Sequence, residues 1–395
     1  MTFEEMDKEY VLHTYNRNYI NFKRGENAAL FSEDGKDFID FTSGIGVVSV
    51  GHGNGRVADA IYNQAQNITH VSNLFLIEPQ AKLAKKIVEL SGFDMAVFFG
   101  NSGAEANEGA IKIARKYGQN RFKNKRYKVL TLEYSFHGRT ITTLKATGQE
   151  SFHQNAFSPY PEGFSYKNQI KDIYSAIDDE TIGVMLELVQ GEGGVQAFDK
   201  KEIKELAAFL QKNDLLLIID EVQTGVFRSG EFLACKLYDI EPDIITLAKG
   251  LAGGVPIGAV MTKHKDIFTY GDHGSTFGGN FLSTRAGLEV LDILENYHKD
   301  GSLKKGIDYF DDKLQQSAKK HPDLFLGKTG LGLMRGLQCK DSGTLSKIIK
   351  AAFDNGVLVL KAGRNTVRFL PPLTISKDEI NEGFARFEKA LDTLK

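Results

Sequence analysis

The chain has 395 residues, of which 42% are hydrophobic and 25% are charged, and its formal net charge is −2 at pH 7. Such a composition is typical of a globular protein long enough for two domains, and the nearly balanced charge argues against nucleic acid as a partner. Two cysteines are too few for a disulfide framework, no apolar run approaches membrane-spanning length, and the N-terminus MTFEEMDKEY resembles no targeting peptide. We therefore expect a cytoplasmic protein without a membrane partner.

The first 50 or so residues predict an arm followed by two short strands, at 29–31 and 38–41, with a turn at Asp34-Gly35 between them. A glycine-rich stretch follows, Ser43-Gly44-Ile45-Gly46-Val47. We interpret His52, between two glycines, as a turn residue.

From about residue 78 to residue 270, short apolar runs alternate with amphipathic stretches of helical period. The strands are expected at 96–99, 127–133, 182–188, 215–219 and 244–247, and the helices at 78–90, from about 103 onward and at 201–212. Such alternation predicts an α/β unit whose mostly parallel sheet is covered by helices on both faces.

The pattern changes after a long helix that contains Leu288, Leu291 and Leu294. We expect strands at 331–338, 357–360 and 366–370, a helix that ends before Gly356, and a last helix that opens with a capping box at Ser376 and Glu379. These elements predict a smaller α+β domain. The expected division is an arm with part of the small domain at 1–50, a large domain at 51–280, and a linking helix with the small domain at 281–395.

Two predicted strand ends carry groups suited to chemistry. The run 215–219 ends at Asp220, and the run 244–247 is followed by Lys249 and a glycine-rich turn. In open α/β sheets the carboxyl ends of the strands face a common crevice. Two interpretations are open: a salt-bridged lysine with a turn-capping aspartate, or a lysine that forms a Schiff base with pyridoxal 5'-phosphate (PLP) and an aspartate that pairs with the pyridinium nitrogen.

A small-residue turn follows the strand 96–99 and leads directly into a helix. Free N–H groups and the helix dipole make such a turn suitable for an anion. Its sequence, GNSGAEANE, is neither GxGxxG nor GxxxxGK[ST], so dinucleotide and Walker-type sites lack their fingerprints.

The segments IIDEVQTG (218–225), TLAKGLAGGVPIGA (246–259) and NSGAEANE (101–108) resemble the cofactor signature of the class-III PLP-dependent aminotransferases. The resemblance implies fold type I, with a large domain built on a mostly parallel sheet and a smaller α+β domain. It implies that Lys249 binds PLP and moves a proton, and that Asp220 pairs with the ring nitrogen. Further expected cofactor contacts are Gln223 at the ring hydroxyl, Phe136 stacked on the ring, and Ser102, Gly103 and Ala104 at the phosphate.

The substrate residues implied by the resemblance lie in FHGR (136–139), QGEGGV (190–195) and VRFLPP (367–372). Arg139 is expected to hold a substrate carboxylate, since a planar guanidinium can bind one in bidentate fashion. Glu192 is expected to pair with a second arginine, Arg368. In GSTFGGN (274–280), Thr276 is expected to reach the cofactor phosphate of the neighbouring subunit, which implies a homodimer. No metal site is expected.

The resemblance is closest to the acetylornithine aminotransferase subgroup, partly through HVSNLFLIEPQ (70–80). It implies transfer of the terminal amino group of N2-acetylornithine to 2-oxoglutarate, with Ile45 forming an apolar rim that suits an acylated amine. Ornithine, succinylornithine and 4-aminobutyrate stay open as donors. Three residues depart from the family pattern: Leu188, Phe227 and Ala252. These departures concern the identity of the substrate.

Two other classes of protein are alternatives. An aminomutase of the same fold moves an amino group within one molecule, so it has little use for two arginines and a glutamate that pairs with one of them. The presence of Glu192 and Arg368 therefore argues against an aminomutase. A non-catalytic binding protein of this fold is expected to lack Lys249 or Asp220, and both are present.

Overall fold

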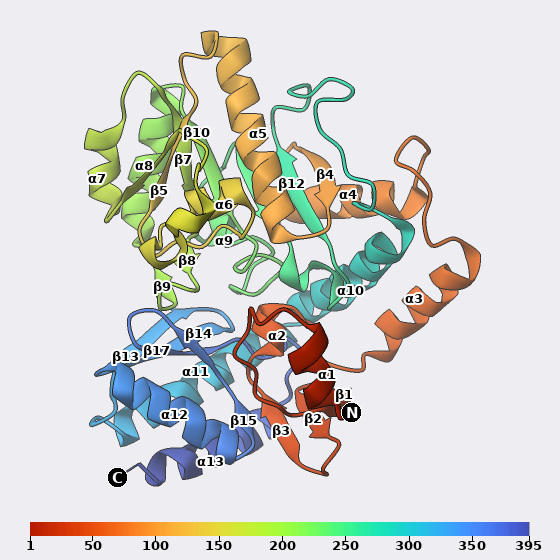
Figure 1. Cartoon of the computed structure of the whole chain (residues 1–395), viewed down its shortest axis with the longest axis vertical. Coiled ribbons are helices and arrows are strands. Elements are labelled where there is room, and N and C mark those ends of the chain that lie inside the picture. Colours follow the sequence, from red (N-terminus) through yellow and green to blue (C-terminus); the bar gives the residue numbers. More distant parts are fainter. Residues whose placement is uncertain (395) are drawn as a thin grey trace.

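The computed structural model describes residues 1–394 and contains one large sheet and two smaller four-stranded sheets (Figure 1). The strands of the large sheet, in spatial order, are β4 (Ala96–Gly100), β12 (Gly258–Thr262), β11 (Ile244–Leu247), β10 (Leu216–Asp220), β7 (Thr181–Leu186), β5 (Lys128–Leu132) and β6 (Phe164–Lys167). All neighbours pair in parallel except β12, which is antiparallel to both β11 and β4. The predicted mostly parallel sheet is thus confirmed.

Both faces of the large sheet are buried, and alternate residues of its strands enter different cores. In β10, Leu216 and Ile218 pack with residues of helix α5 (Gly103–Phe122), whereas Leu217 and Ile219 pack with residues of α4 (Glu78–Ser91) and α8 (Lys200–Lys212). Because side chains of a strand alternate between faces, a continuous apolar run suits a strand that is covered twice. This arrangement leaves the carboxyl ends of the strands free to build a site.

The second part of the molecule combines the two ends of the chain (Figure 1). One sheet joins β1 (Phe22–Glu26), β2 (Ala29–Ser32) and β3 (Asp37–Asp40) to β15 (Val357–Leu358), which pairs in parallel with β3. The other sheet has the order β13 (Phe325–Leu331), β14 (Met334–Cys339), β17 (Thr366–Phe369) and β16 (Leu360–Ala362). Helices α11 (Ser302–Lys320), α12 (Ser342–Asp354) and α13 (Lys377–Asp392) pack on these strands.

The other helices are α1 (Phe3–Tyr10), α2 (Ser43–Gly46), α3 (Gly55–Asn67), α6 (Ile141–Ala146), α7 (Ile170–Ala176), α9 (Ala234–Leu237) and the long α10 (Phe281–Lys299). Three short 3-10 helices lie at η1 (Glu150–Phe152), η2 (Asn155–Phe157) and η3 (Lys249–Ala252), and β8 (Val189–Gln190) pairs with β9 (Gln196–Ala197). The predicted capping box of the last helix is confirmed, because Ser376 accepts from the Glu379 amide and Glu379 accepts from the Ser376 amide.

Several predicted strands differ from the observed ones. The strand expected at 331–338 begins too early: Leu331 ends β13, β14 begins at Met334, and the two strands form a hairpin whose turn contains Gly332 at φ +58°. The strand expected at 357–360 is divided between β15 and β16, which belong to different sheets. The strand expected at 182–188 already ends at Leu186. At 357–360 the apolar run VLVL continues through the break between the two strands, which hydrophobicity alone does not mark.

The described residues include no helix that is both long and apolar enough to cross a membrane. They also include no group of three or more His, Cys, Asp or Glu side chains arranged to hold a metal ion.

Candidate active site

A cavity of about 420 Å³ lies at the carboxyl ends of β10 and β11, where the sequence predicted the crevice. The structure brings most of the predicted cofactor and substrate residues to this one cavity. The predicted residues that line it are Ser102, Gly103, Ala104, Phe136, Arg139, Asp220, Gln223 and Lys249.

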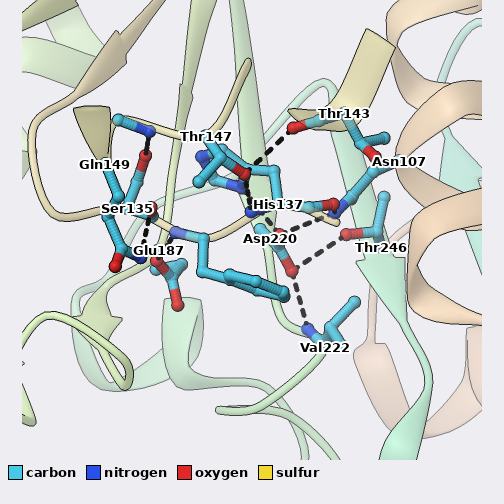
Figure 2. A network of polar contacts seen from close by, with 12 residues as sticks. Asn107, Ser135, His137, Thr143, Thr147, Gln149, Glu187, Asp220, Val222 and Thr246 are labelled. Atoms are coloured by element: carbon cyan, nitrogen blue, oxygen red, sulfur yellow. Dashed lines mark hydrogen bonds and ion pairs between the residues drawn. The ribbon is translucent and has the colours of Figure 1, made fainter. Parts of the chain in front are cut away.

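Asp220 is the last residue of β10, is only 3% exposed, and is held by donors from several elements (Figure 2). Its Oδ2 accepts a hydrogen bond from Asn107 Nδ2 at 2.8 Å and lies 2.8 Å from His137 Nδ1. Its Oδ1 accepts from the Val222 amide at 3.0 Å. These contacts fix the orientation of the carboxylate at the floor of the cavity.

Asn107 and His137 were not among the predicted site residues. Asn107 lies four residues after Gly103 on α5, hence on the same helix face, and this spacing was the available signal. Its Nδ2 also donates to the His137 carbonyl at 2.7 Å. His137 is buried against Asp220, and its Nε2 has no hydrogen-bond partner within the described residues. The pair holds Asp220 in place.

Lys249 begins η3, two residues after the end of β11 at Leu247, and has φ +39°, an uncommon backbone conformation for a residue with a side chain. Burial in the cavity wall lowers the pKa of Lys249 from its ordinary value, and the nearby positive charge of Arg368 acts in the same direction. Both effects favour the neutral amine, which is the form that can accept a proton.

Glu187 is a further cavity residue that the sequence analysis did not find. It follows the end of β7, is 5% exposed, and accepts a hydrogen bond from the Phe136 amide at 3.0 Å. Burial raises the pKa of Glu187 to about 7. The carboxyl group therefore tethers the segment that carries Phe136, His137 and Arg139.

The helix N-terminus at the cavity is capped and closely packed. Ser102 is the N-cap of α5, and its Oγ accepts from the Glu105 amide at 3.2 Å. A Cβ atom added to Gly103 would lie 2.8 Å from Val222 Cγ1, so a larger residue would push into the cavity wall. The first N–H groups of a helix have no partner inside the helix, which leaves those of Gly103 and Ala104 available for an anion.

The two predicted substrate arginines have different surroundings. Arg368, on β17, is 2% exposed, and its Nη1 lies 2.7 Å from Glu192 Oε1 and 3.3 Å from Gln223 Oε1. Arg139 is exposed, and its guanidinium lies 4.0 Å from the ring centroid of Phe152. Within residues 1–394, no carboxylate forms an ion pair with Arg139, in contrast to Arg368.

Ile45 and Thr276 do not line this cavity. Ile45 is 42% exposed and sits in α2, whose four residues all have positive φ, with +68° at Ile45 itself. The cavity is instead lined by Val47, one residue beyond that turn. Thr276 is exposed and lines a separate hollow together with Asn73 and Leu74.

The residues present fit PLP. The cavity combines a helix N-terminus for a phosphate, a buried carboxylate for a ring nitrogen and a lysine for an aldehyde. Two buried polar atoms beside it, His137 Nε2 and Asn107 Oδ1, lack partners within the described part of the chain. An unsatisfied polar atom is costly when buried, so polar groups of a bound cofactor suit this environment.

Comparison with known proteins agrees with the geometry. The family model Aminotransferase class-III matches residues 10–391. An acetylornithine aminotransferase from Wolinella succinogenes is 60% identical over 389 residues, which cover 98% of this chain and 99% of that protein. Among solved structures, an ornithine aminotransferase from Toxoplasma gondii has a TM-score of 0.92 at 29% identity, covering 99% of this chain and 94% of that one. An N-acetylornithine aminotransferase from Stenotrophomonas maltophilia has a TM-score of 0.82 at 31% identity, covering 96% and 97%. Given these matches and the cavity that joins Lys249 to Asp220, the chain belongs to the class-III aminotransferases, whose cofactor is PLP.

Proposed function

We propose that the enzyme transfers the terminal amino group of N2-acetylornithine to 2-oxoglutarate, giving N-acetylglutamate 5-semialdehyde and glutamate. The observation that carries this proposal is the contrast between its two arginines. Arg368 is neutralised by Glu192 at 2.7 Å, whereas Arg139 has no carboxylate partner in the described chain. A donor with one carboxylate far from its reacting amine can therefore bind Arg139 without disturbing the Glu192–Arg368 pair.

The relatives support the choice of donor. The protein from Wolinella succinogenes carries the name acetylornithine aminotransferase and aligns over almost the whole chain. Val47 lines the cavity, and Ile45 precedes it by two residues. Apolar side chains suit an acylated amine better than a free ammonium group, which would lose its hydration beside them.

PLP, when bound, withdraws electrons from the substrate carbon that bears the amine. The chain supplies position and proton transfer. We assign Lys249 Nζ as the group that accepts the proton released from that carbon and returns it, a role that the lowered pKa of the lysine favours. Asp220 would pair its negative charge with the ring nitrogen, and Ser102, Gly103 and Ala104, which line the same cavity, would hold the phosphate.

Glutamate has two carboxylates and must be accommodated differently. We assign its side-chain carboxylate to Arg139 and its α-carboxylate to Arg368, which requires Glu192 to move away. Glu192 can do so because its side chain is 31% exposed, whereas Arg368 stays buried. The pair thus acts as a gate that is closed for the amine donor and open for glutamate.

Replacing Glu192 with alanine is expected to expose Arg368 and raise kcat/KM for glutamate relative to the amine donor by roughly tenfold, since removing a gate charge is worth about 1.4 kcal/mol or more. The two half-reactions are measured separately by stopped-flow absorbance. Glu205→Ala, an exposed change on α8, serves as the control. An unchanged ratio of the two kcat/KM values would rule out the gate.

The donor itself is tested with the purified holoenzyme and no keto acid. N2-acetylornithine is expected to remove the absorption band of the bound cofactor, and 2-oxoglutarate is expected to restore it. Ornithine, succinylornithine and 4-aminobutyrate are added in parallel. A response to one of these that exceeds the response to N2-acetylornithine would replace the proposed donor.

We also propose that the enzyme is a homodimer in the cytoplasm and that Thr276 reaches the cofactor phosphate of the neighbouring subunit. Thr276 does not line its own cavity and shares a separate hollow with the exposed apolar residues Leu74 and Tyr270, and further exposed apolar residues adjoin these three in sequence. The further residues are Phe75, Leu76 and Phe277. Such a patch is typical of a protein interface. Both cysteines are buried and form no disulfide, which agrees with a reducing compartment. A monomer in sedimentation equilibrium of the active enzyme would contradict the dimer.

A further inference from the structure

Three backbone segments meet beside the Glu192–Arg368 pair. They are Tyr134 after β5, the loop 191–195 between β8 and β9, and the turn 363–365 between β16 and β17. The first two belong to connections of the large sheet, and the third belongs to the sheet that carries Arg368. The turn 363–365 therefore joins the two parts of the molecule at the gate.

The contact at this point is backbone against backbone. A Cβ atom on Gly193 would lie 2.8 Å from the Tyr134 carbonyl oxygen, and one on Gly194 would lie 2.8 Å from the Gly363 carbonyl oxygen. The Gly363 amide donates a hydrogen bond to the Glu192 carbonyl at 2.8 Å. The loop that carries Glu192 is therefore attached to the turn at 363–365 through its main chain.

Arg364 adds a side chain to this attachment. Its Nη1 donates to the Gly193 carbonyl at 2.7 Å and lies 3.3 Å from Gln190 Oε1. Its guanidinium lies 4.2 Å from the ring centroid of Tyr134, within the range of a cation–π contact. No carboxylate of the described chain pairs with Arg364, and its hydrogen bonds go to Gln190 at the end of β8 and to Gly193 in the loop 191–195.

These contacts bear directly on the gate. The Glu192 carbonyl accepts a hydrogen bond from the Gly363 amide, and the Gly193 carbonyl accepts one from Arg364 Nη1. The distance of 2.7 Å between Glu192 and Arg368 depends on the position of that backbone. A hydrogen bond from a charged donor is among the stronger ones in proteins, so its loss frees the loop.

We propose that Arg364 is a positioning residue that holds the Glu192 loop and thereby sets how readily the gate opens for an α-carboxylate. This inference rests on the proposed gate and names the residue that tunes it. Arg364 acts through Glu192 and touches neither the cavity lining nor Arg368.

The test compares Arg364→Gly with Arg364→Lys and with Lys361→Ala, an exposed lysine on the same hairpin. Glycine suits the φ of +50° at position 364, so the backbone of the turn is kept while the side chain is lost. Hydrogen exchange of the full chain without cofactor is measured first. The amides of residues 190–195 are expected to exchange about tenfold faster in Arg364→Gly, and less so in Arg364→Lys, which keeps a charged donor. If the amides of residues 190–195 exchange no faster in Arg364→Gly than in Lys361→Ala, the proposal is overturned.

The second measurement is the ratio of kcat/KM for glutamate to that for the amine donor. Arg364→Gly is expected to raise it about threefold or more, and to change it little when Glu192→Ala is already present, because both variants act through one gate. Two results would assign Arg364 a purely structural role. One is an equal loss of kcat/KM in both half-reactions of Arg364→Gly, and the other is a full additional change in the ratio when Arg364→Gly is combined with Glu192→Ala. If Glu192→Ala alone leaves the ratio unchanged, the proposed gate fails, and the exchange result alone then decides whether Arg364 holds the loop.

Discussion

Replacing Lys249 with alanine is expected to lower kcat of the amine half-reaction by at least about 10³-fold, since a positioned proton acceptor contributes on the order of 10²–10⁴ to the rate. The loss follows from the position of Lys249, which faces the same cavity as Asp220 and has a pKa lowered by burial. Single-turnover stopped-flow absorbance measures the rate directly. Lys265→Ala, beyond the far end of β12, is the matched control.

A small amine gives this prediction a second readout. Methylamine can enter the space left by the Lys249 side chain and accept the proton, so it is expected to restore part of the rate in Lys249→Ala. A variant that keeps more than a tenth of kcat without added amine would contradict the role of Lys249 in proton transfer.

Replacing Asp220 with asparagine is expected to lower kcat by about 10²-fold or more, in the range found when one preorganised electrostatic group is removed. Asparagine has nearly the same shape but lacks the negative charge that we propose pairs with the ring nitrogen of PLP. It also presents an amide N–H₂ group toward Asn107 and His137, both within 2.8 Å of the carboxylate. The rate of the amine half-reaction and the affinity for PLP are both expected to fall.

The neighbouring acid provides the control for Asp220→Asn. Glu221 is fully buried but faces away from the cavity lining, and it accepts hydrogen bonds from Thr224 Oγ1 at 2.5 Å and the Cys235 amide at 2.8 Å. Glu221→Gln is expected to lower the thermal midpoint while leaving kcat within about twofold, since it disturbs packing and hydrogen bonding only. Equal loss of kcat in both variants would show that a general disturbance of β10 explains the Asp220 result.

The family, the fold type and the cofactor were predictable from short segments of the sequence, and all three are confirmed. Asp220 and Lys249 could be placed in one crevice because each follows a buried strand, and β10 and β11 are parallel neighbours. Strand ends of a parallel sheet meet at one edge, so local patterns sufficed for this part of the site.

Other parts of the fold were not visible in local patterns. β12 is antiparallel because the chain returns directly from η3 through residues 253–257, with no crossover helix. The hairpin of β13 and β14 was missed because its turn at Gly332 lies inside the stretch expected as one strand, and most of β13 precedes that stretch. Hydrophobic periodicity reports burial and is silent about such turns.

The sequence by its own local patterns determined the parallel sheet, the helix N-terminus beside Gly103 and the strand ends that carry the acid and the lysine. Only the tertiary structure decided which polar groups meet: His137, Asn107 and Glu187 around the cavity, and Arg364 on the loop of Glu192. The reason is physical. Periodicity follows from burying apolar area, which each element does along its own length, whereas a directional hydrogen bond between distant segments exists only once those elements have packed.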